Sequence, residues 1–181
     1  VGLKYFKMLF ETPAFWNILK NTLLISSIKI FFIFPFPVIF ALLLNEVGRT
    51  KFGKVVQVVS YMPHFLSWVI IAGIWIDAFS QGGMVSSLME MLGIEYKNLM
   101  VDKDAIIPIL TGSEMWRSVG WDSIIYLSAI LGISKELYDA AAIDGAGRWK
   151  IVRHIILPAL AIPMVTVLIL NVGFIMSAGL D

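Results

Sequence analysis

The sequence has 181 residues, of which 59% are hydrophobic and 15% are charged, and its mean hydropathy is +0.85. Soluble domains carry about 45–50% apolar and about 25% charged residues, so this composition indicates a membrane protein. The absence of cysteine excludes a disulfide framework, a thiolate metal site and a cysteine nucleophile, and the net charge of +1 indicates no nucleic-acid-binding surface.

Residues 1–17 are too short and too charged to cross a bilayer. Their apolar residues recur at helical spacing, at Leu3, Phe6, Leu9 and Phe10. This pattern predicts an external interfacial segment, an amphipathic helix that lies on the outer membrane surface. Because the chain starts at Val1 and stops directly after an apolar run, we expect both ends to be truncations of a longer membrane domain.

Four later stretches are apolar and long enough to form transmembrane helices, which need about 20 residues. They are residues 18–44, 61–79, 105–131 and 155–176. All four are predicted to be helices, because a spanning strand has about 10 residues of alternating polarity. The predicted fold class is therefore all-α: one polytopic transmembrane helical bundle over residues 1–181, with four spans in this chain.

The loops between these spans predict the orientation, because Lys and Arg concentrate on the cytoplasmic side. Residues 45–60 carry three Lys or Arg and residues 132–154 carry four, whereas residues 80–104 mix two lysines with four acidic residues. We therefore place residues 45–60 and 132–154 in the cytoplasm and residues 80–104 outside. A short external helix is expected at residues 83–93.

The cytoplasmic loop at residues 132–154 has the features of a structured element. Ser134 suits a helix N-cap, and Glu136 lies in the first turn, where a negative charge favours the helix dipole. Alanines at 140–142 favour that helix and add almost no side-chain bulk. Small side chains here would let the backbone of another protein approach closely.

A turn and a second helix are predicted to complete this loop. Asp144 and Gly145 should end the first helix, because glycine tolerates the left-handed conformation that a helix end requires. The second helix is expected to begin near Ala146 and to run toward Pro158, which ends or kinks it. The loop is therefore predicted to be a helix–turn–helix at the membrane surface.

The same loop contains residues with a defined spacing: Tyr138, Asp139, Ala140, Ala141, Asp144, Gly145, Ala146, and then Ile155, Leu157 and Pro158. This pattern resembles the EAA loop of binding-protein-dependent ABC importer permeases. The resemblance implies that the first seven residues form or shape a coupling helix that docks on a separate ATPase subunit. The family's Glu is Asp139 here, which keeps the charge but shortens its reach. The alternative is an ordinary alanine-rich hairpin at the membrane surface.

Several further segments match a second pattern: residues 21–23, 41–46, 61–65, 120–121 and 179–181. They resemble the carbohydrate-type permeases, especially those for multiple sugars or oligosaccharides. The resemblance implies a multi-pass protein of the cell membrane with typically six spans, of which this chain would hold the second to the fifth. The implied partners are an ABC ATPase dimer, a second permease subunit that is homologous or identical, and an extracytoplasmic solute-binding protein.

No chemistry on this chain itself is expected. ATP would be hydrolysed by the partner, because this chain has no G-x-x-x-x-G-K-[ST] phosphate loop, so we assign it no cofactor. The two histidines, His64 and His154, lie too far apart in sequence to suggest a metal site. His64 is interpreted as a polar contact at the cytoplasmic start of the second span. The chain is therefore predicted not to be an enzyme.

Polar and aromatic residues within the spans are the candidates for a substrate path: Lys29, Asp77, Trp116, Arg117, Trp121 and Asp122. A charge at the bilayer centre costs about 2.5–3.5 kcal/mol on insertion scales, so it should face protein or water. Aromatic faces beside hydrogen-bonding groups suit sugar rings, which have apolar faces and hydroxyl edges. The alternative is that these charges pair with one another to stabilise the bundle and that the Trp side chains mark the membrane interfaces.

The sequence thus favours the permease of an ATP-driven sugar importer, with two other transport functions open. The EAA-like loop is shared across importers, so the substrate could be a peptide, phosphate or another solute. An ion-driven secondary transporter would explain buried Asp and Lys residues as ion sites, but it leaves the structured loop unexplained. An intramembrane enzyme ranks last, since no Ser/His, Asp/Asp or His/Glu-x-x-His constellation is present.

Overall fold

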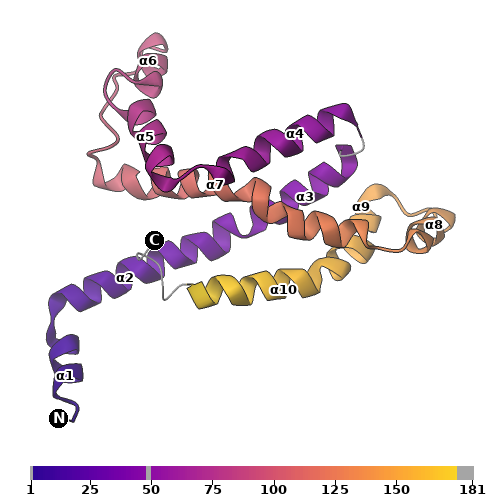
Figure 1. The fold of residues 1–181 in the computed structure, drawn as a ribbon, viewed down its shortest axis with the longest axis horizontal. Coiled ribbons are helices and arrows are strands. Elements are labelled where there is room, and N and C mark those ends of the chain that lie inside the picture. The colour runs from indigo at the N-terminus through magenta and orange to yellow at the C-terminus, as the bar shows by residue number, and fades with distance from the viewer. Residues whose placement is uncertain (1, 48–49, 175–181) are drawn as a thin grey trace.

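The structure is a computed structural model that describes residues 2–47 and 50–174. Within these residues it contains only helices, turns and loops (Figure 1). The predictions for residues 175–176 of the last span and for residues 179–181 lie outside the described part of the chain. The helical fold class predicted from composition and span length is confirmed.

The chain starts with a short helix, α1 (Lys4–Glu11), and then forms α2 (Pro13–Ile28) and α3 (Pro35–Val47). A π-helical turn at Lys29–Ile33 joins α2 to α3, so the helix is continuous. Phe34 N–H donates to the Lys29 carbonyl at 2.9 Å, which is the i to i+5 spacing of a π turn. The next residue is a proline, which has no N–H to donate, and the wide turn accommodates it.

The second membrane segment differs from the prediction. Most of the expected loop at residues 45–60 is a helix, α4 (Lys51–Tyr61), which runs back along the bundle. The expected span at residues 61–79 is divided, because a 3₁₀ turn at Met62–Phe65 separates α4 from α5 (Trp68–Phe79).

Backbone chemistry explains this helix break, residues 62–67. Pro63 lacks an N–H, and Leu66 and Ser67 are extended, with ψ of 139° and 152°. The Ser67 hydroxyl then accepts from Ile70 N–H at 3.4 Å and starts α5. The expected short helix in the next loop is present as α6 (Met84–Met91).

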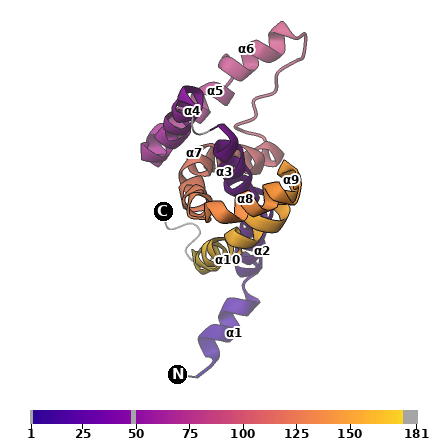
Figure 2. The same ribbon diagram turned by 90° about the vertical axis from the view of Figure 1, so that its right-hand side faces the viewer.

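The longest helix, α7 (Lys103–Leu131), is the central element of the fold. Its 29 residues span about 43 Å at 1.5 Å per residue, which exceeds the roughly 30 Å hydrocarbon core of a bilayer. It packs against α3, α4, α5 and α10 (Leu157–Phe174). Figure 2 shows α5 and α6 leaving the bundle on one side and α1 leaving it on the other.

The loop at residues 132–154 lies at one end of α7 (Figure 1). It contains α8 (Lys135–Ile143) and α9 (Arg148–Ile151), and a π turn at Val152–Ile156 leads directly into α10. The segments predicted to be external, α1 and α6, lie at the other end of the bundle (Figure 1). This arrangement is the one that the predicted orientation requires.

Two contacts hold the bundle together. Buried residues of α3, α7 and α10 form the core, with Ala41 and Leu160 fully buried and Tyr126 1% exposed. On another face of α7, a Cβ on Gly120 would lie 2.1 Å from the Ser60 carbonyl oxygen, so only glycine lets α4 approach this closely.

Three of the described helical stretches are long and apolar enough to cross a membrane: Pro13–Val47, Trp68–Met91 and Arg148–Gly173. The predicted span at residues 105–131 is part of α7, which has the length but carries Glu114, Arg117 and Asp122 near its middle. A helix with such a polar centre needs protein or water beside it rather than lipid. The four span boundaries themselves remain predictions.

Candidate functional site

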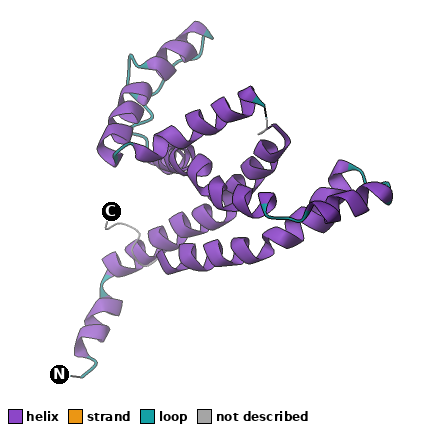
Figure 3. Ribbon diagram, turned by 45° about the vertical axis from the view of Figure 1, so that its right-hand side comes forward, coloured by secondary structure: helices purple, strands orange, loops and turns teal. Residues whose placement is uncertain are grey.

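The first candidate site is the coupling segment, which we define as residues 134–147. Ser134 caps α8, its hydroxyl accepting from Glu136 N–H at 3.3 Å, as the sequence predicted. The helix ends at Ile143, and Gly145, two residues later, has φ of +68°. The second helix starts at Arg148, two residues later than expected, after the extended Gly147. Figure 3 shows the two short helices with their connecting turn.

The turn is fixed by two backbone hydrogen bonds. Gly145 N–H donates to the Ala142 carbonyl at 3.1 Å, and Ala146 N–H donates to the Ala141 carbonyl at 2.9 Å. This pair of bonds is a Schellman motif, which requires a left-handed residue at the position of Gly145. The turn is therefore a rigid feature of the loop.

The seven residues predicted to dock on the ATPase fall into two groups. Asp139, Ala140, Asp144 and Gly145 are exposed, whereas Tyr138, Ala141 and Ala146 are half-buried. Tyr138 packs against the core of α3, α7 and α10, and this burial raises the pKa of its hydroxyl. Tyr138 thus anchors the segment to the bundle rather than forming part of its outer surface.

Two exposed apolar side chains, one in this segment and one directly after it, were missed in the sequence. Ile143 is 87% exposed and Trp149 is 72% exposed. Two large apolar residues in a short helical hairpin are the available signal, and exposed apolar side chains of this size are typical of protein–protein contact surfaces. An ion pair between Arg148 and Glu46, at 3.5 Å, links the start of α9 to the end of α3.

The second candidate site follows one face of α7, which we call the α7 stripe: Glu114, Arg117 and Trp121. These residues are spaced i, i+3 and i+7 and therefore share a face. Lys29, in the π turn before α3, pairs with Glu114 at 3.0 Å between Nζ and Oε2. Of the two interpretations of Lys29, path lining and ion pairing, the structure shows an ion pair, and its acid, Glu114, is not one of the six path candidates.

The middle of the α7 stripe faces the helix break. The Arg117 guanidinium carbon lies 4.8 Å from the centroid of the Trp68 ring. The His64 ring stacks on Trp121, with centroids 4.4 Å apart and an interplanar angle of 3°. His64 is therefore beside the middle of α7, not at the cytoplasmic start of a span.

Aromatic side chains extend this region. Phe65 contacts Trp121 edge-on at 5.3 Å, and Trp75 contacts Trp116 edge-on at 6.4 Å. Phe65, Trp68 and Trp75 were missed as site candidates, because only the break in the helix brings them to α7. Pro63 inside an apolar run was the signal available in the sequence.

Two of the six path candidates do not join the cluster. Asp77 is exposed on α5. Asp122 is five residues from Arg117, which places it about 140° round α7 and outside ion-pair distance. A cation–π contact is worth about 0.5–2 kcal/mol, less than the cost of a charge at the centre of a bilayer. The contact with Trp68 alone therefore does not account for Arg117.

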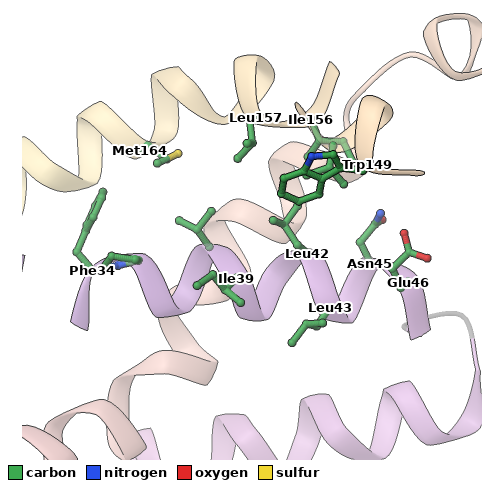
Figure 4. Close-up of a pocket in the computed structure, with 13 residues that line it drawn as sticks. Phe34, Ile39, Leu42, Leu43, Asn45, Glu46, Trp149, Ile156, Leu157 and Met164 are labelled. Carbon is green, nitrogen blue, oxygen red and sulfur yellow. The ribbon is translucent and has the colours of Figure 1, made fainter. Parts of the chain in front are cut away.

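An apolar groove of about 520 Å³ separates α3 from α9 and α10. Phe34 and Met164 lie at one end of it, and Asn45, Glu46 and Trp149 lie at the other (Figure 4). Apart from these last three residues its lining is aliphatic, aromatic or Met and Pro. A hydroxyl-rich ligand would find few hydrogen-bond partners there, so the groove is no candidate for a saccharide.

The chain is similar to known transport proteins over its whole length. It is 40% identical over 182 aligned positions to the polygalacturonan/rhamnogalacturonan transport system permease protein YteP of Bacillus subtilis, covering all of this chain and 57% of that protein. It is 30% identical to the arabinooligosaccharides transport system permease protein AraP of the same species, covering 97% of this chain and 55% of that one. The chain thus spans little more than half the length of these relatives.

Solved structures show the same relationship. The chain matches a bacterial ABC transporter involved in the import of the acidic polysaccharide alginate with a TM-score of 0.95 and 35% identity, over 99% of this chain and 63% of that one. The family model of the binding-protein-dependent transport system inner membrane component matches residues 33–180. The chain therefore belongs to the family of binding-protein-dependent transport system inner membrane components, which are multi-pass membrane transport proteins and not enzymes.

Proposed function

We propose that this chain is part of the permease subunit of an ATP-driven oligosaccharide importer and that its coupling segment docks on the ATPase. The observation that carries the docking proposal is the division of the segment into an exposed and an anchored side. Asp139, Asp144 and Ile143 face outward, while Tyr138 packs on the core. A force applied to the exposed side would reach the core of the bundle through Tyr138. It would also reach α10 through α9 and the π turn at Val152–Ile156, which form one continuous helix with it.

The partners follow from the same proposal. A dimer of ATPase subunits binds and hydrolyses ATP, so this chain needs no cofactor of its own. A second permease subunit completes the path, and a solute-binding protein delivers the substrate from outside. One similar solved structure is an alginate ABC transporter in complex with an alginate pentasaccharide-bound periplasmic protein, which supports such an assembly.

The substrate path is proposed to run along the α7 stripe. The exposed parts of the Trp68 and Trp121 side chains suit the apolar faces of sugar rings, and the charged residues supply hydrogen bonds. Relatives are named for polygalacturonan, for arabinooligosaccharides and for lactose, and a similar structure transports alginate. These names include both acidic and neutral saccharides, so they support the class of saccharides without separating the two kinds.

The docking proposal is tested by two glycines that differ only in backbone conformation. Gly145 has φ of +68° and Gly147 does not, and neither has an atom within 4 Å of an added Cβ. A left-handed L residue costs about 1–2 kcal/mol, so Gly145→Val in the full-length protein should weaken ATPase binding by roughly tenfold or more. Binding is measured by titration of the purified ATPase onto the permease in nanodiscs, and uptake is measured in proteoliposomes.

Gly147→Val is the matched control and should bind the ATPase nearly as well as wild type. Full uptake by the Gly145→Val protein would refute the docking proposal. Oligosaccharide uptake that continues in proteoliposomes without ATPase would refute the ATP-driven mechanism and favour an ion-driven transporter.

A further inference from the structure

Arg117 differs from Lys29, the charged residue that the π turn between α2 and α3 brings to the α7 stripe. The charge of Lys29 is paired with Glu114 at 3.0 Å. Arg117 has no acidic partner within 4 Å among the described residues, and its buried Nε has no hydrogen-bond partner there. Asp122 is close enough to act on Arg117 electrostatically, but it makes no ion pair with it. The positive charge of Arg117 is therefore not paired with an acidic side chain in the described part of the chain.

The surroundings of Arg117 define the shape of that ligand. Trp68, over which the guanidinium lies, is 39% exposed, and Trp121, one turn along α7, is 38% exposed. The stacking of His64 on Trp121 fixes the orientation of that indole. A guanidinium over one partly exposed indole, with a second partly exposed indole one turn along α7, fits a chain of pyranose rings with an anionic group on one of them.

The position in the fold also points to a ligand. Arg117 lies at the middle of α7, opposite the helix break at residues 62–67. Transport proteins commonly form substrate sites where a membrane helix is interrupted near the bilayer midplane. An ionisable residue at such a depth indicates function when no partner in the bundle neutralises it.

We propose that Arg117 recognises a carboxylate on the transported saccharide and thereby makes the path selective for uronate-containing oligosaccharides. The guanidinium offers a planar pair of N–H donors, which match the two oxygens of a carboxylate and bind it more strongly than a neutral hydroxyl. Trp68 and Trp121 contact the sugar rings on either side. This inference rests on the proposed function of the chain as an oligosaccharide permease.

The test uses two probes that differ only at the carboxyl groups: trigalacturonate and the same trimer with its carboxyl groups reduced to alcohols. Both are titrated onto the full-length permease assembled with its second permease and ATPase subunits in detergent, without the solute-binding protein, so that only the path selects. The wild-type complex should bind trigalacturonate at least about tenfold more tightly than the reduced trimer. Arg117→Gln should remove this preference by weakening the acidic trimer alone.

Two further variants test the shape of the cation and its position in the chain. Arg117→Lys keeps the charge without the planar fork and should retain an intermediate preference. Lys54→Gln removes one positive charge from exposed α4, away from the site, and should leave the preference unchanged. A preference that survives in Arg117→Gln, or that falls equally in Lys54→Gln, would overturn the inference.

The failure of this inference can be distinguished from the failure of the proposed function. A complex that assembles, binds the reduced trimer and shows no preference in the wild type refutes the role of Arg117 but not the permease function. A complex that binds neither trimer refutes the proposed saccharide path, and the inference fails with it. ATPase binding by Arg117→Gln and Arg117→Lys confirms that the variants are folded.

Discussion

The segment α4–α5 and the segment α9–α10 both carry a proline in an apolar helical stretch, but their backbones differ. At Pro63 the helix stops, and a new helix starts at the Ser67 cap. At Pro158 the helix continues, because a π turn precedes the proline and Leu157 N–H donates to the Val152 carbonyl. The first arrangement separates two rigid pieces, and the second joins the coupling segment to a membrane helix.

This difference indicates how one helical bundle can provide both the proposed substrate-binding surface and the proposed connection to the ATPase. A break exposes side chains such as Trp68 and releases backbone groups at the centre of a membrane helix, which suits a ligand. A continuous helix transmits displacement along its length, which suits coupling. The α2–α3 junction at Pro35 repeats the continuous form. The groove between α3 and α10 is lined by Val152 and Ile156 of one π turn and by Phe34 and Pro35, which directly follow the other.

The largest expected effect comes from the contact between Gly120 of α7 and Ser60 of α4, which positions the segment that the helix break interrupts. Gly120→Val should prevent α4 from packing on α7, because even a Cβ there would lie 2.1 Å from the Ser60 carbonyl oxygen. Overpacking of this kind typically costs about 1–3 kcal/mol, and a backbone clash falls at or above the upper end. The thermal midpoint of the purified full-length protein, followed by circular dichroism in nanodiscs, measures the loss.

Gly112→Ala is the matched control on the same helix. Its nearest contact would be the Trp75 side chain at 3.9 Å, which is ordinary van der Waals distance. Alanine favours a helix interior over glycine by roughly 0.5–1 kcal/mol, so this variant should be as stable as wild type or more stable. Equal midpoints for Gly120→Val and wild type would show that α4 does not pack on α7 at this point.

The region from α8 to α10, which we call the coupling side, was more predictable from the sequence than the region of α4 and α5, which we call the interrupted side. Ser134 and Gly145 act on their own backbone within a few residues, so cap and turn chemistry identifies them without tertiary information. The inward position of Tyr138 could not be read in the same way, because it depends on the core that α3, α7 and α10 form. The coupling helix was thus predictable, but not which of its faces is exposed.

The interrupted side was harder because its signals conflict. Lys51 and Lys54 indicate a cytoplasmic loop by charge, yet they lie in α4, and their long side chains tolerate a position at a membrane border. The break at residues 62–67 needs Pro63 and the Ser67 cap together inside an apolar run. The pairing of Lys29 with Glu114 joins distant helices and has no local signature.

The next largest effect should come from the two serine caps, one in each region. Ser67→Ala removes the cap of α5, and Ser134→Ala removes the cap of α8. Loss of a serine N-cap costs typically about 1 kcal/mol, and these two bonds are long, at 3.4 and 3.3 Å. We expect Ser67→Ala to weaken oligosaccharide binding a few-fold and Ser134→Ala to weaken ATPase binding a few-fold.

Titration of both ligands onto both variants gives the check on the caps. Each variant serves as the control for the other, since each should change one affinity and leave the second near the wild-type value. If both variants weaken both ligands equally, the two regions are one coupled unit, and the proposed separation between a binding break and a coupling helix is wrong.

The smallest effect concerns the ion pair that links the coupling side to α3. Arg148 and Glu46 lie 3.5 Å apart, but their side chains are 89% and 47% exposed. Water and salt screen such a pair, so a double-mutant cycle of Arg148→Ala and Glu46→Ala on thermal stability should give a coupling energy of about 0–1 kcal/mol. The energy should fall as salt rises, because the Debye length shortens. Lys150→Ala, which removes another exposed cation of α9, is the control. A coupling energy above this range, present only with ATPase bound and unchanged at high salt, would show that docking shields the pair from water. The pair would then contribute to the proposed connection between the ATPase and the bundle.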